Sequence, residues 1–237
     1  MKRSLSERLV MLDDPRSFQA EAYRVLRTNL HYANPDAPLR RILITSAGPG
    51  EGKSTTVANL GISLAQSERA VLLVDTDLRR PMLHALFRQP NNPGLSSYLA
   101  GDALLDAVVQ KTAVPNLSIV ASGPTPPNPA ELLGSRRMRD FVNSVSERFD
   151  AVVFDSPPVL AVSDACTLAS LVDGVLLVVG SGTAPQASLR RAKEQILAVR
   201  GRIIGAVVNR FDAGAAGYSK RYYDTYDGYY TRGTKAK

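Results

Sequence analysis

The fold is decided by one stretch of the chain, Ser46-Ala47-Gly48-Pro49-Gly50-Glu51-Gly52-Lys53-Ser54-Thr55, which follows the apolar run Ile42-Leu43-Ile44. A strand, a glycine-rich turn and a helix start that ends in Gly-Lys-Ser form the pattern of a phosphate-binding P-loop. Its glycines let successive backbone N–H groups face one anion, and the positive end of the helix dipole adds to the attraction. We therefore predict that Lys53 reaches the β- and γ-phosphates and that the Ser54 hydroxyl ligates Mg²⁺. The predicted nucleotide-binding residues of the loop are Gly48, Pro49, Gly50, Glu51, Gly52, Lys53, Ser54 and Thr55.

Apolar strands alternate with helical patterns after this loop, and several of the strands are apolar throughout. Such strands are typical of a parallel sheet that is covered on both faces, so we predict a doubly wound, mostly parallel α/β fold of the P-loop NTPase type. The expected strands are 41–45, 70–74, 117–120, 151–154, 174–179 and 203–208. The expected helices are 17–32, 54–67, 79–87, 94–109, 130–148, 163–171 and 185–199. The chain then divides into an N-terminal helical segment (1–38), an ATP-binding domain (39–211) and a C-terminal tail (212–237).

Composition narrows the class of protein. The chain has 237 residues, 44% of them hydrophobic, which is enough for one good core, and no apolar run approaches the roughly 20 residues of a membrane helix. The N-terminus shows no secretory pattern, and the lone Cys166 fits a reducing cytoplasm. With two histidines, a histidine metal site is implausible. The net charge is +7, but no zinc-ligand spacing, RNA-binding signature or recognition helix is present, so no nucleic-acid partner is expected.

The C-terminal tail is rich in tyrosine. Six of the nine tyrosines lie in this segment, and no Val, Ile or Leu follows Val208. Because such a segment buries too little apolar surface to offset its ordering entropy, we predict a flexible tail. A tyrosine-rich edge strand and an aromatic surface for nucleic acid are the alternatives. Near an ATP site, these phenols are candidate phosphate acceptors: Tyr218, Tyr222, Tyr223, Tyr226, Tyr229 and Tyr230.

Carboxylates follow two of the predicted strands. Asp75 and Asp77 come after Val71-Leu72-Leu73-Val74, and Asp155 comes after Ala151-Val152-Val153-Phe154. The carboxyl ends of parallel strands meet at one edge of the sheet, where a nucleotide-bound cation needs oxygen ligands. Either strand end could instead use its aspartate to cap a helix. With a P-loop in the same chain, we predict that Ser54 and Asp155 hold Mg²⁺ together with one acid of the Asp75–Asp77 pair, which we take to be Asp75.

These motifs together resemble the bacterial tyrosine kinases of capsule and exopolysaccharide synthesis, from Glu21 to Asn209 and in the tail. The resemblance is carried by the P-loop, by Val-Asp-Thr-Asp-Leu-Arg-Arg-Pro from Val74, by Phe-Asp-Ser-Pro-Pro from Phe154, by Pro-Pro-Asn-Pro-Ala-Glu-Leu-Leu, and by the tyrosine cluster. It implies an ATP- and Mg²⁺-dependent autokinase that phosphorylates tail tyrosines, mainly in trans within a ring-like homo-oligomer.

The resemblance also implies roles for individual residues. Lys53, Asp75, Asp77 and Arg79 would be catalytic, with the division of labour between the two aspartates left open. Asn209 and Arg210 match the place where relatives contact the base. Glu21, Arg24 and Arg27 match the family's oligomerisation element, and their spacing puts them on roughly one helix face. A solvated ion pair within the helix is the alternative.

The expected partners follow from the same resemblance. They are further copies of the chain, a membrane-embedded activator of the polysaccharide co-polymerase type, and sugar-nucleotide enzymes as substrates. We expect a separate cytoplasmic chain that is recruited to the inner face of the cell membrane.

Two other functions compete with this one. A positioning ATPase of the MinD/ParA group would act as a nucleotide switch, but that group carries a lysine where this chain has Gly48. A degenerate regulator would bind ATP without phosphorylating protein, but Lys53, Asp75, Asp77 and Asp155 are all present.

Overall fold

The structure, a computed structural model, describes residues 9–33 and 38–211. Its centre is a seven-stranded sheet with the strand order β3-β4-β2-β5-β1-β6-β7. Every pairing is parallel except that of β3 with β4, which is antiparallel. The strands are β1 (Arg41–Ser46), β2 (Val71–Asp75), β3 (Val109–Lys111), β4 (Leu117–Val120), β5 (Ala151–Asp155), β6 (Gly174–Gly180) and β7 (Ile203–Asn209).

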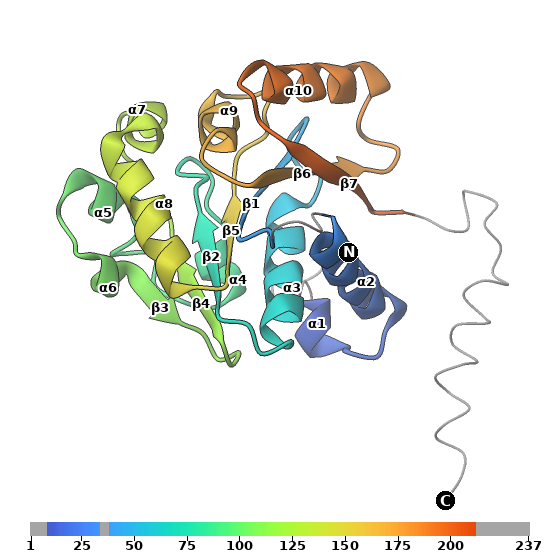
Figure 1. Ribbon diagram of the computed structural model, residues 1–237, viewed down its shortest axis with the longest axis horizontal. Helices are drawn as coiled ribbons and strands as arrows, with labels where there is room; N and C mark the ends of the chain where they lie inside the picture. Colours follow the sequence, from blue (N-terminus) through green and yellow to red (C-terminus); the bar gives the residue numbers. More distant parts are fainter. Residues whose placement is uncertain (1–8, 34–37, 212–237) are drawn as a thin grey trace, which may run out of the picture.

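Helices cover both faces of the sheet, and one hydrophobic cluster lies under each set. Successive residues of β1 alternate between the clusters: Ile42 and Ile44 belong to the first, and Leu43 to the second. On the first face lie α1 (Val10–Asp13), α2 (Phe18–Tyr32), α3 (Lys53–Ala65) and α4 (Leu83–Leu86). On the second face lie α5 (Leu95–Ala100), α6 (Leu105–Val108), α7 (Pro129–Gly134), α8 (Arg136–Arg148), α9 (Asp164–Ala169) and α10 (Gln186–Ala198). Figure 1 shows α3 and α8 on opposite sides of the central strands.

The helix that follows the P-loop is the most buried element. Eleven of the thirteen residues of α3 are buried, because α1 and α2 cover the side that the sheet leaves open. The side-chain oxygen of Asn59 accepts a hydrogen bond from the backbone N–H of Met11 at 3.1 Å, which fixes α1 onto α3. The N-terminal segment that the structure describes therefore shares the hydrophobic cluster on the first face of the sheet.

The predicted α/β fold is confirmed, and the differences are local. The expected helix 130–148 is two helices, because Ser135 leaves the helical conformation and its hydroxyl accepts the N–H of Met138 to cap α8. The expected helix 94–109 is likewise α5 and α6, and the chain then enters β3, a short edge strand that the sequence analysis missed. The expected helix 79–87 shrinks to the single turn of α4.

Parts of the predicted organisation lie outside the described residues. This applies to residues 1–8 and 34–37, and to residues 212–237 with all six candidate tyrosines. The division into three parts therefore stays a prediction. Among the helices that the structure describes, none is long and apolar enough to cross a lipid bilayer.

Candidate nucleotide-binding and phosphotransfer site

The P-loop connects the end of β1 to the start of α3. Gly50 and Gly52 have φ angles of 75° and 95°, in the left-handed region that L side chains rarely adopt. A Cβ atom on Gly52 would also collide with the side-chain amide of Asn209. The two glycines are thus required by the backbone path of the loop, which brings Lys53 to the first turn of the buried helix.

Glu51, predicted to bind nucleotide, turns its side chain into the protein and is only 3% exposed. One carboxylate oxygen accepts the N–H of Gly48 at 2.5 Å, and the other accepts the N–H of Gly180 at 2.9 Å. Gly180 ends β6, so this carboxylate fastens the P-loop to a neighbouring strand. The backbone of the loop, rather than the Glu51 side chain, is what remains to face a phosphate group.

Asn209 and Arg210, at the end of β7, also lie against the P-loop. The Asn209 amide donates to the backbone oxygen of Glu51 at 3.0 Å, and its own side-chain oxygen accepts the N–H of Arg210 at 2.8 Å. Arg210 adopts a φ of 57°, so the chain turns sharply here. The structure therefore brings this predicted base-contact pair to the loop, and contact with a base stays a prediction.

Asp155 and Asp75 are side by side on neighbouring strands. They are register partners across the parallel pair β2 and β5, with exposed fractions of 1% and 0%. Neither carboxylate oxygen of Asp155 has a hydrogen-bond partner within the described part of the chain. Burial raises the pKa of Asp155 to about 7 and the charge of Asp77 adds to the rise, while the Ser54 hydroxyl and the Lys53 ammonium oppose it.

Asp75 is held more firmly than Asp155. One of its oxygens accepts the N–H groups of Met82 and Leu83, each at 2.9 Å, and the other accepts the N–H of Asp77 at 3.2 Å. Burial raises the pKa of Asp75 well above its usual value, and the charges of Asp155 and Asp77 raise it further. The two backbone N–H groups at Met82 and Leu83 act in the opposite direction. These interactions show that the structure brings Lys53, Ser54, Asp75, Asp77 and Asp155 to one edge of the sheet.

Arg79, which was predicted to be catalytic, pairs with Asp164, and its catalytic role stays a prediction. Its Nε atom is 3.4 Å from an oxygen of Asp164, the fully buried first residue of α9. Asp77 instead accepts the backbone N–H groups of Arg79 and Arg80, at 3.3 and 2.9 Å. The sequence analysis missed Asp164, because an aspartate at the start of a helix looks like an ordinary first-turn acid.

The donor set fits Mg²⁺ bound together with a nucleotide. No group of three or more His, Cys, Asp or Glu side chains in the described residues forms a metal cage. Mg²⁺ on a nucleotide needs only one or two carboxylates, because phosphates and waters complete its octahedron. The oxygens of Asp155, which lie near the Ser54 hydroxyl and lack a well-formed hydrogen bond in the described part of the chain, meet that requirement.

A cavity of about 420 Å³ borders the P-loop on its outer side. It lies between Gly48 and Pro49 of the loop, the Leu160-Ala161 segment that precedes α9, and residues 183–188 around the start of α10. The site therefore has room beyond the phosphate cradle.

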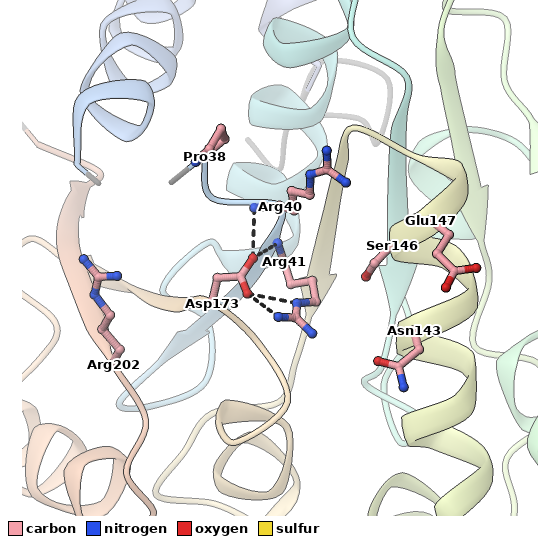
Figure 2. Close-up of a pocket in the computed structure, with 8 residues that line it drawn as sticks. All are labelled: Pro38, Arg40, Arg41, Asn143, Ser146, Glu147, Asp173 and Arg202. Atoms are coloured by element: carbon pink, nitrogen blue, oxygen red, sulfur yellow. Dashed lines mark hydrogen bonds and ion pairs between the residues drawn. The ribbon is translucent and has the colours of Figure 1, made fainter. Parts of the chain in front are cut away.

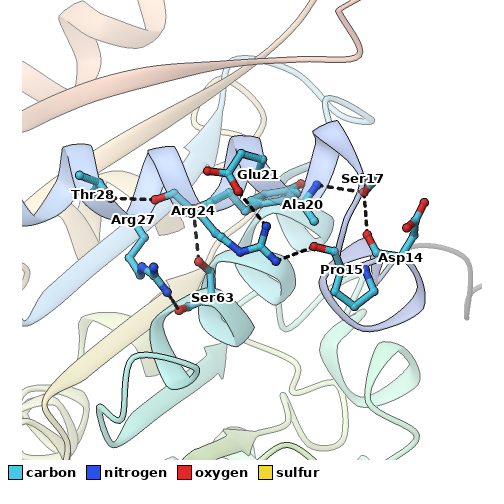
Figure 3. Close-up of polar contacts among 10 residues, drawn as sticks. Asp14, Pro15, Ser17, Ala20, Glu21, Arg24, Arg27, Thr28 and Ser63 are labelled. Atoms are coloured by element: carbon cyan, nitrogen blue, oxygen red, sulfur yellow. Dashed lines mark hydrogen bonds and ion pairs between the residues drawn. The ribbon is translucent and has the colours of Figure 1, made fainter. Parts of the chain in front are cut away.

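The predicted oligomerisation triplet lies on α2 and makes contacts within the chain (Figure 3). Arg24 pairs with Glu21 at 2.8 Å and also donates to the backbone oxygen of Pro15 at 2.5 Å. Arg27 donates to the backbone oxygen of Ser63 at 2.6 Å and so links α2 to α3. The triplet thus helps to dock α2, and its role between copies stays a prediction.

Comparisons with known proteins show which family the chain resembles. A family model described as an AAA domain matches residues 39–199. The tyrosine-protein kinase YwqD of Bacillus subtilis is 40% identical over 205 residues, covering 86% of this chain and 86% of that protein. The putative tyrosine-protein kinase CapB of Staphylococcus aureus is 33% identical over 209 residues, covering 88% and 92%.

Solved structures give the same result. The chimerical protein CapA2B2 superposes with a TM-score of 0.84 at 36% identity, covering 86% of this chain and 90% of that one. The septum site-determining protein MinD from Pyrococcus horikoshii, complexed with Mg-ADP, has a TM-score of 0.62 at 27% identity, covering 77% and 72%. The positioning-ATPase alternative is thus the less similar of the two.

The fold, the P-loop and the matched domain define a P-loop NTPase-like protein of the AAA class. Within that class, the chain belongs to the bacterial tyrosine-protein kinase family and is a protein-tyrosine kinase. The predicted family is confirmed.

Proposed function

We propose that this chain is an autokinase that transfers the γ-phosphate of ATP to tyrosines of its own C-terminal tail. The observation that supports this most strongly is Asp155, a buried carboxylate near Lys53 and Ser54 whose two oxygens lack a geometrically well-formed hydrogen bond within residues 9–33 and 38–211. A buried charge of this kind is costly unless a ligand satisfies it, and a nucleotide-bound cation is the ligand that the adjacent P-loop supplies.

The residues then divide the reaction between them. The loop amides and Lys53 hold the β- and γ-phosphates, and Ser54 and Asp155 hold Mg²⁺, which when bound balances the charge of the transferred group. A free phenol has a pKa near 10, so a base must take its proton. We assign that task to the Asp75–Asp77 pair, in which burial raises the pKa of Asp75 and so makes its carboxylate a stronger base, while the other acid of the pair supports the metal side. The phenolate oxygen then bonds to the γ-phosphorus, the bond to the β–γ bridging oxygen breaks, and ADP leaves.

The setting of the reaction rests on the family resemblance. We propose that transfer occurs mainly in trans within a ring-like homo-oligomer, through Glu21, Arg24 and Arg27. We further propose a role in capsular or exopolysaccharide synthesis and export, at the inner face of the membrane. A membrane-embedded activator and sugar-nucleotide enzymes as substrates complete this proposal.

Autophosphorylation is the direct test. Incubation with Mg-ATP and detection of phosphotyrosine should give a signal in the wild type and none in Lys53→Met, with a membrane activator added if the chain alone is silent. Replacement of all six tail tyrosines by phenylalanine should remove the signal while ATP binding persists. A persistent absence of phosphotyrosine despite the activator would contradict the kinase mechanism.

Transfer in trans needs a mixing experiment. The six-fold Tyr→Phe chain, which keeps its site, is mixed with Lys53→Met, which keeps its tyrosines. Phosphotyrosine on the Lys53→Met chain shows transfer between copies. Because phosphates make the tail strongly negative, we expect phosphorylated wild type to form smaller assemblies than the Tyr→Phe chain. Identical masses by light scattering would refute that expectation.

A further inference from the structure

A second pocket lies at the edge of the sheet opposite the P-loop (Figure 2). Its volume is about 760 Å³. It opens where β1, β6 and β7 begin, whereas the nucleotide site lies where β1, β2 and β5 end. The six residues of β1 separate the two sites by roughly 17 Å of extended chain. Its lining residues are Pro38, Arg40, Arg41, Asn143, Ser146, Glu147, Asp173 and Arg202.

Asp173 organises the pocket, and its hydrogen-bonding capacity is used up by the protein. One oxygen accepts Nε of Arg41 at 2.9 Å and an Nη of the same residue at 2.5 Å. The other oxygen accepts the backbone N–H groups of Arg40 and Arg41, at 3.0 and 2.8 Å. Although burial alone would raise it, the pKa of Asp173 is lowered by these bonds, so the acid stays ionised. Asp173 therefore fixes Arg41 in place and neutralises a single positive charge.

The remaining charges leave the pocket positive. Arg40 and Arg202 stand on opposite sides of Asp173 in Figure 2, and Glu147 on α8 is the other acid in the lining. The guanidinium of Arg40 is exposed and makes no hydrogen bond or ion pair within residues 9–33 and 38–211. On the facing wall, α8 presents the Asn143 amide.

The chemistry of the lining selects the class of ligand. Pro38 is the one apolar side chain among the lining residues, and no aromatic ring is present, so a hydrophobic ligand has little to contact. Guanidinium groups bind carboxylates and phosphates through paired N–H donors, and an arginine whose rotamer is already fixed loses less entropy on binding. A volume several times that of a phosphate ion leaves space for the group to which the phosphate is attached.

We propose that this pocket is an anion-binding site for the phosphate group of a polar phosphate ester. The phosphate lies between Arg40 and Arg41, Arg202 on the other side of Asp173 adds positive charge at longer range, and Asn143 faces the polar remainder of the ligand. This site is separate from the P-loop and does not depend on the autokinase reaction proposed above. Because the arginines are partly exposed, binding is weak and salt-sensitive, with a dissociation constant on the order of 1 mM at low salt.

Amide NMR titration tests the site directly, because Arg40 and Arg41 report through backbone N–H groups that bond to Asp173. The probes are glucose 1-phosphate, O-phosphotyrosine and inorganic phosphate, with glucose and tyrosine as their phosphate-free counterparts. We expect saturable shifts at Arg40, Arg41 and Asp173 with at least one phosphate-bearing probe and none with glucose or tyrosine. The probe that binds tightest distinguishes a sugar phosphate, a phosphorylated side chain and free phosphate as the source.

Two double variants distinguish binding in this pocket from a general effect of the protein's positive charge. Arg40→Gln/Arg202→Gln should weaken binding at least fivefold, whereas Arg190→Gln/Arg191→Gln, which removes the same charge from the exposed face of α10, should stay within twofold of wild type. The amide spectra show at once whether each variant is folded, and Arg40→Lys serves as a milder replacement that keeps the charge. Equal weakening in both double variants, equal shifts with glucose or tyrosine, or shifts confined to residues 48–55 would each overturn the proposal.

Discussion

Asp155 and Asp173 are the same amino acid at opposite edges of one sheet, but their hydrogen bonding and their pKa shifts are opposite. Asp155 is buried with no hydrogen-bond partner for either oxygen in the described residues, and its pKa is raised to about 7. Asp173 accepts four hydrogen bonds, and its pKa is lowered. The oxygens of Asp155 can therefore still accept hydrogen bonds, whereas four donors already occupy the oxygens of Asp173.

The difference indicates what each acid is for. A buried carboxylate that the fold leaves unsatisfied destabilises the protein by itself, so its presence points to a ligand that compensates for it. A carboxylate that the fold saturates stabilises the local structure and positions its partners. By this criterion we assign Asp155 to the proposed reaction, whereas Asp173 belongs to the framework that holds Arg41.

The comparison is tested most strongly by Asp155→Asn. Removal of the carboxylate charge should lower phosphotransfer at least 100-fold, because Mg²⁺ loses an anionic ligand. The ligand-free protein should be no less stable at pH 7, since an unpartnered buried charge disappears. Kinetic assay and urea unfolding measure the two effects. An unfolded Asp155→Asn protein would show that the carboxylate is structural after all.

Asp173→Asn should show the reverse pattern. An amide can accept at only one of its two heavy atoms, so two of the four hydrogen bonds are lost, and we expect a loss of about 2 kcal/mol in unfolding free energy. The affinity for Mg-ADP should change less than twofold, because the change lies at the other edge of the sheet. Chemical denaturation and calorimetry of the same samples check this. A large loss of nucleotide affinity would mean that the two edges are coupled.

The pH dependence of stability follows from the raised pKa of Asp155. Between about pH 4 and pH 7 the folded protein holds a proton that the unfolded chain has released, so stability falls as pH rises through this window. Without nucleotide, a pKa about three units above that of the unfolded chain corresponds to about 4 kcal/mol, and this contribution should be missing from Asp155→Asn. Asp75 adds a slope of the same sign in both proteins. Parallel stability curves for the two proteins would contradict the shifted pKa of Asp155.

Glu51 tests whether hydrogen bonding, rather than location at the P-loop edge of the sheet, decides how a carboxylate affects stability. It lies in the P-loop, at the same edge as Asp155, but both of its oxygens accept backbone N–H groups. Glu51→Gln should therefore behave like the Asp173 variant and lower stability by about 1 kcal/mol, through the loss of one acceptor. Thermal unfolding without nucleotide measures this effect, with Glu68→Gln on the exposed surface as a control. A gain in stability would instead mean that the Glu51 carboxylate, like that of Asp155, destabilises the ligand-free protein.

Much of the fold was readable from short-range patterns. The apolar runs predicted the six parallel strands to within about one residue at each end. The inner strands are apolar because both of their faces are buried, and the partly exposed edge strand β7 also carries an apolar run. The strand β3 was missed because Val109-Gln110-Lys111 is too short and too polar to show any such run. The predicted helix 130–148 failed at Ser135, where a capping hydroxyl interrupts an otherwise continuous helical pattern.

The predicted site was likewise readable only where a simple rule relates the sequence to the fold. The grouping of Lys53, Ser54, Asp75, Asp77 and Asp155 followed from one topological rule, that parallel strands end at the same edge. The partners of Arg79 and Glu51 followed from no such rule. Arg79 meets Asp164, 85 residues away, and Glu51 meets Gly180, 129 residues away.

By itself, the sequence determined the class of ligand, the parallel sheet and the edge at which the reactive groups meet, because glycine conformations and strand burial are local requirements. The tertiary structure alone decided which carboxylates are satisfied and which are left without partners, and where Arg40, Arg41 and Arg202 gather. Hydrogen bonds and solvent exclusion depend on segments that are far apart in the chain, and no local pattern records which of them will meet.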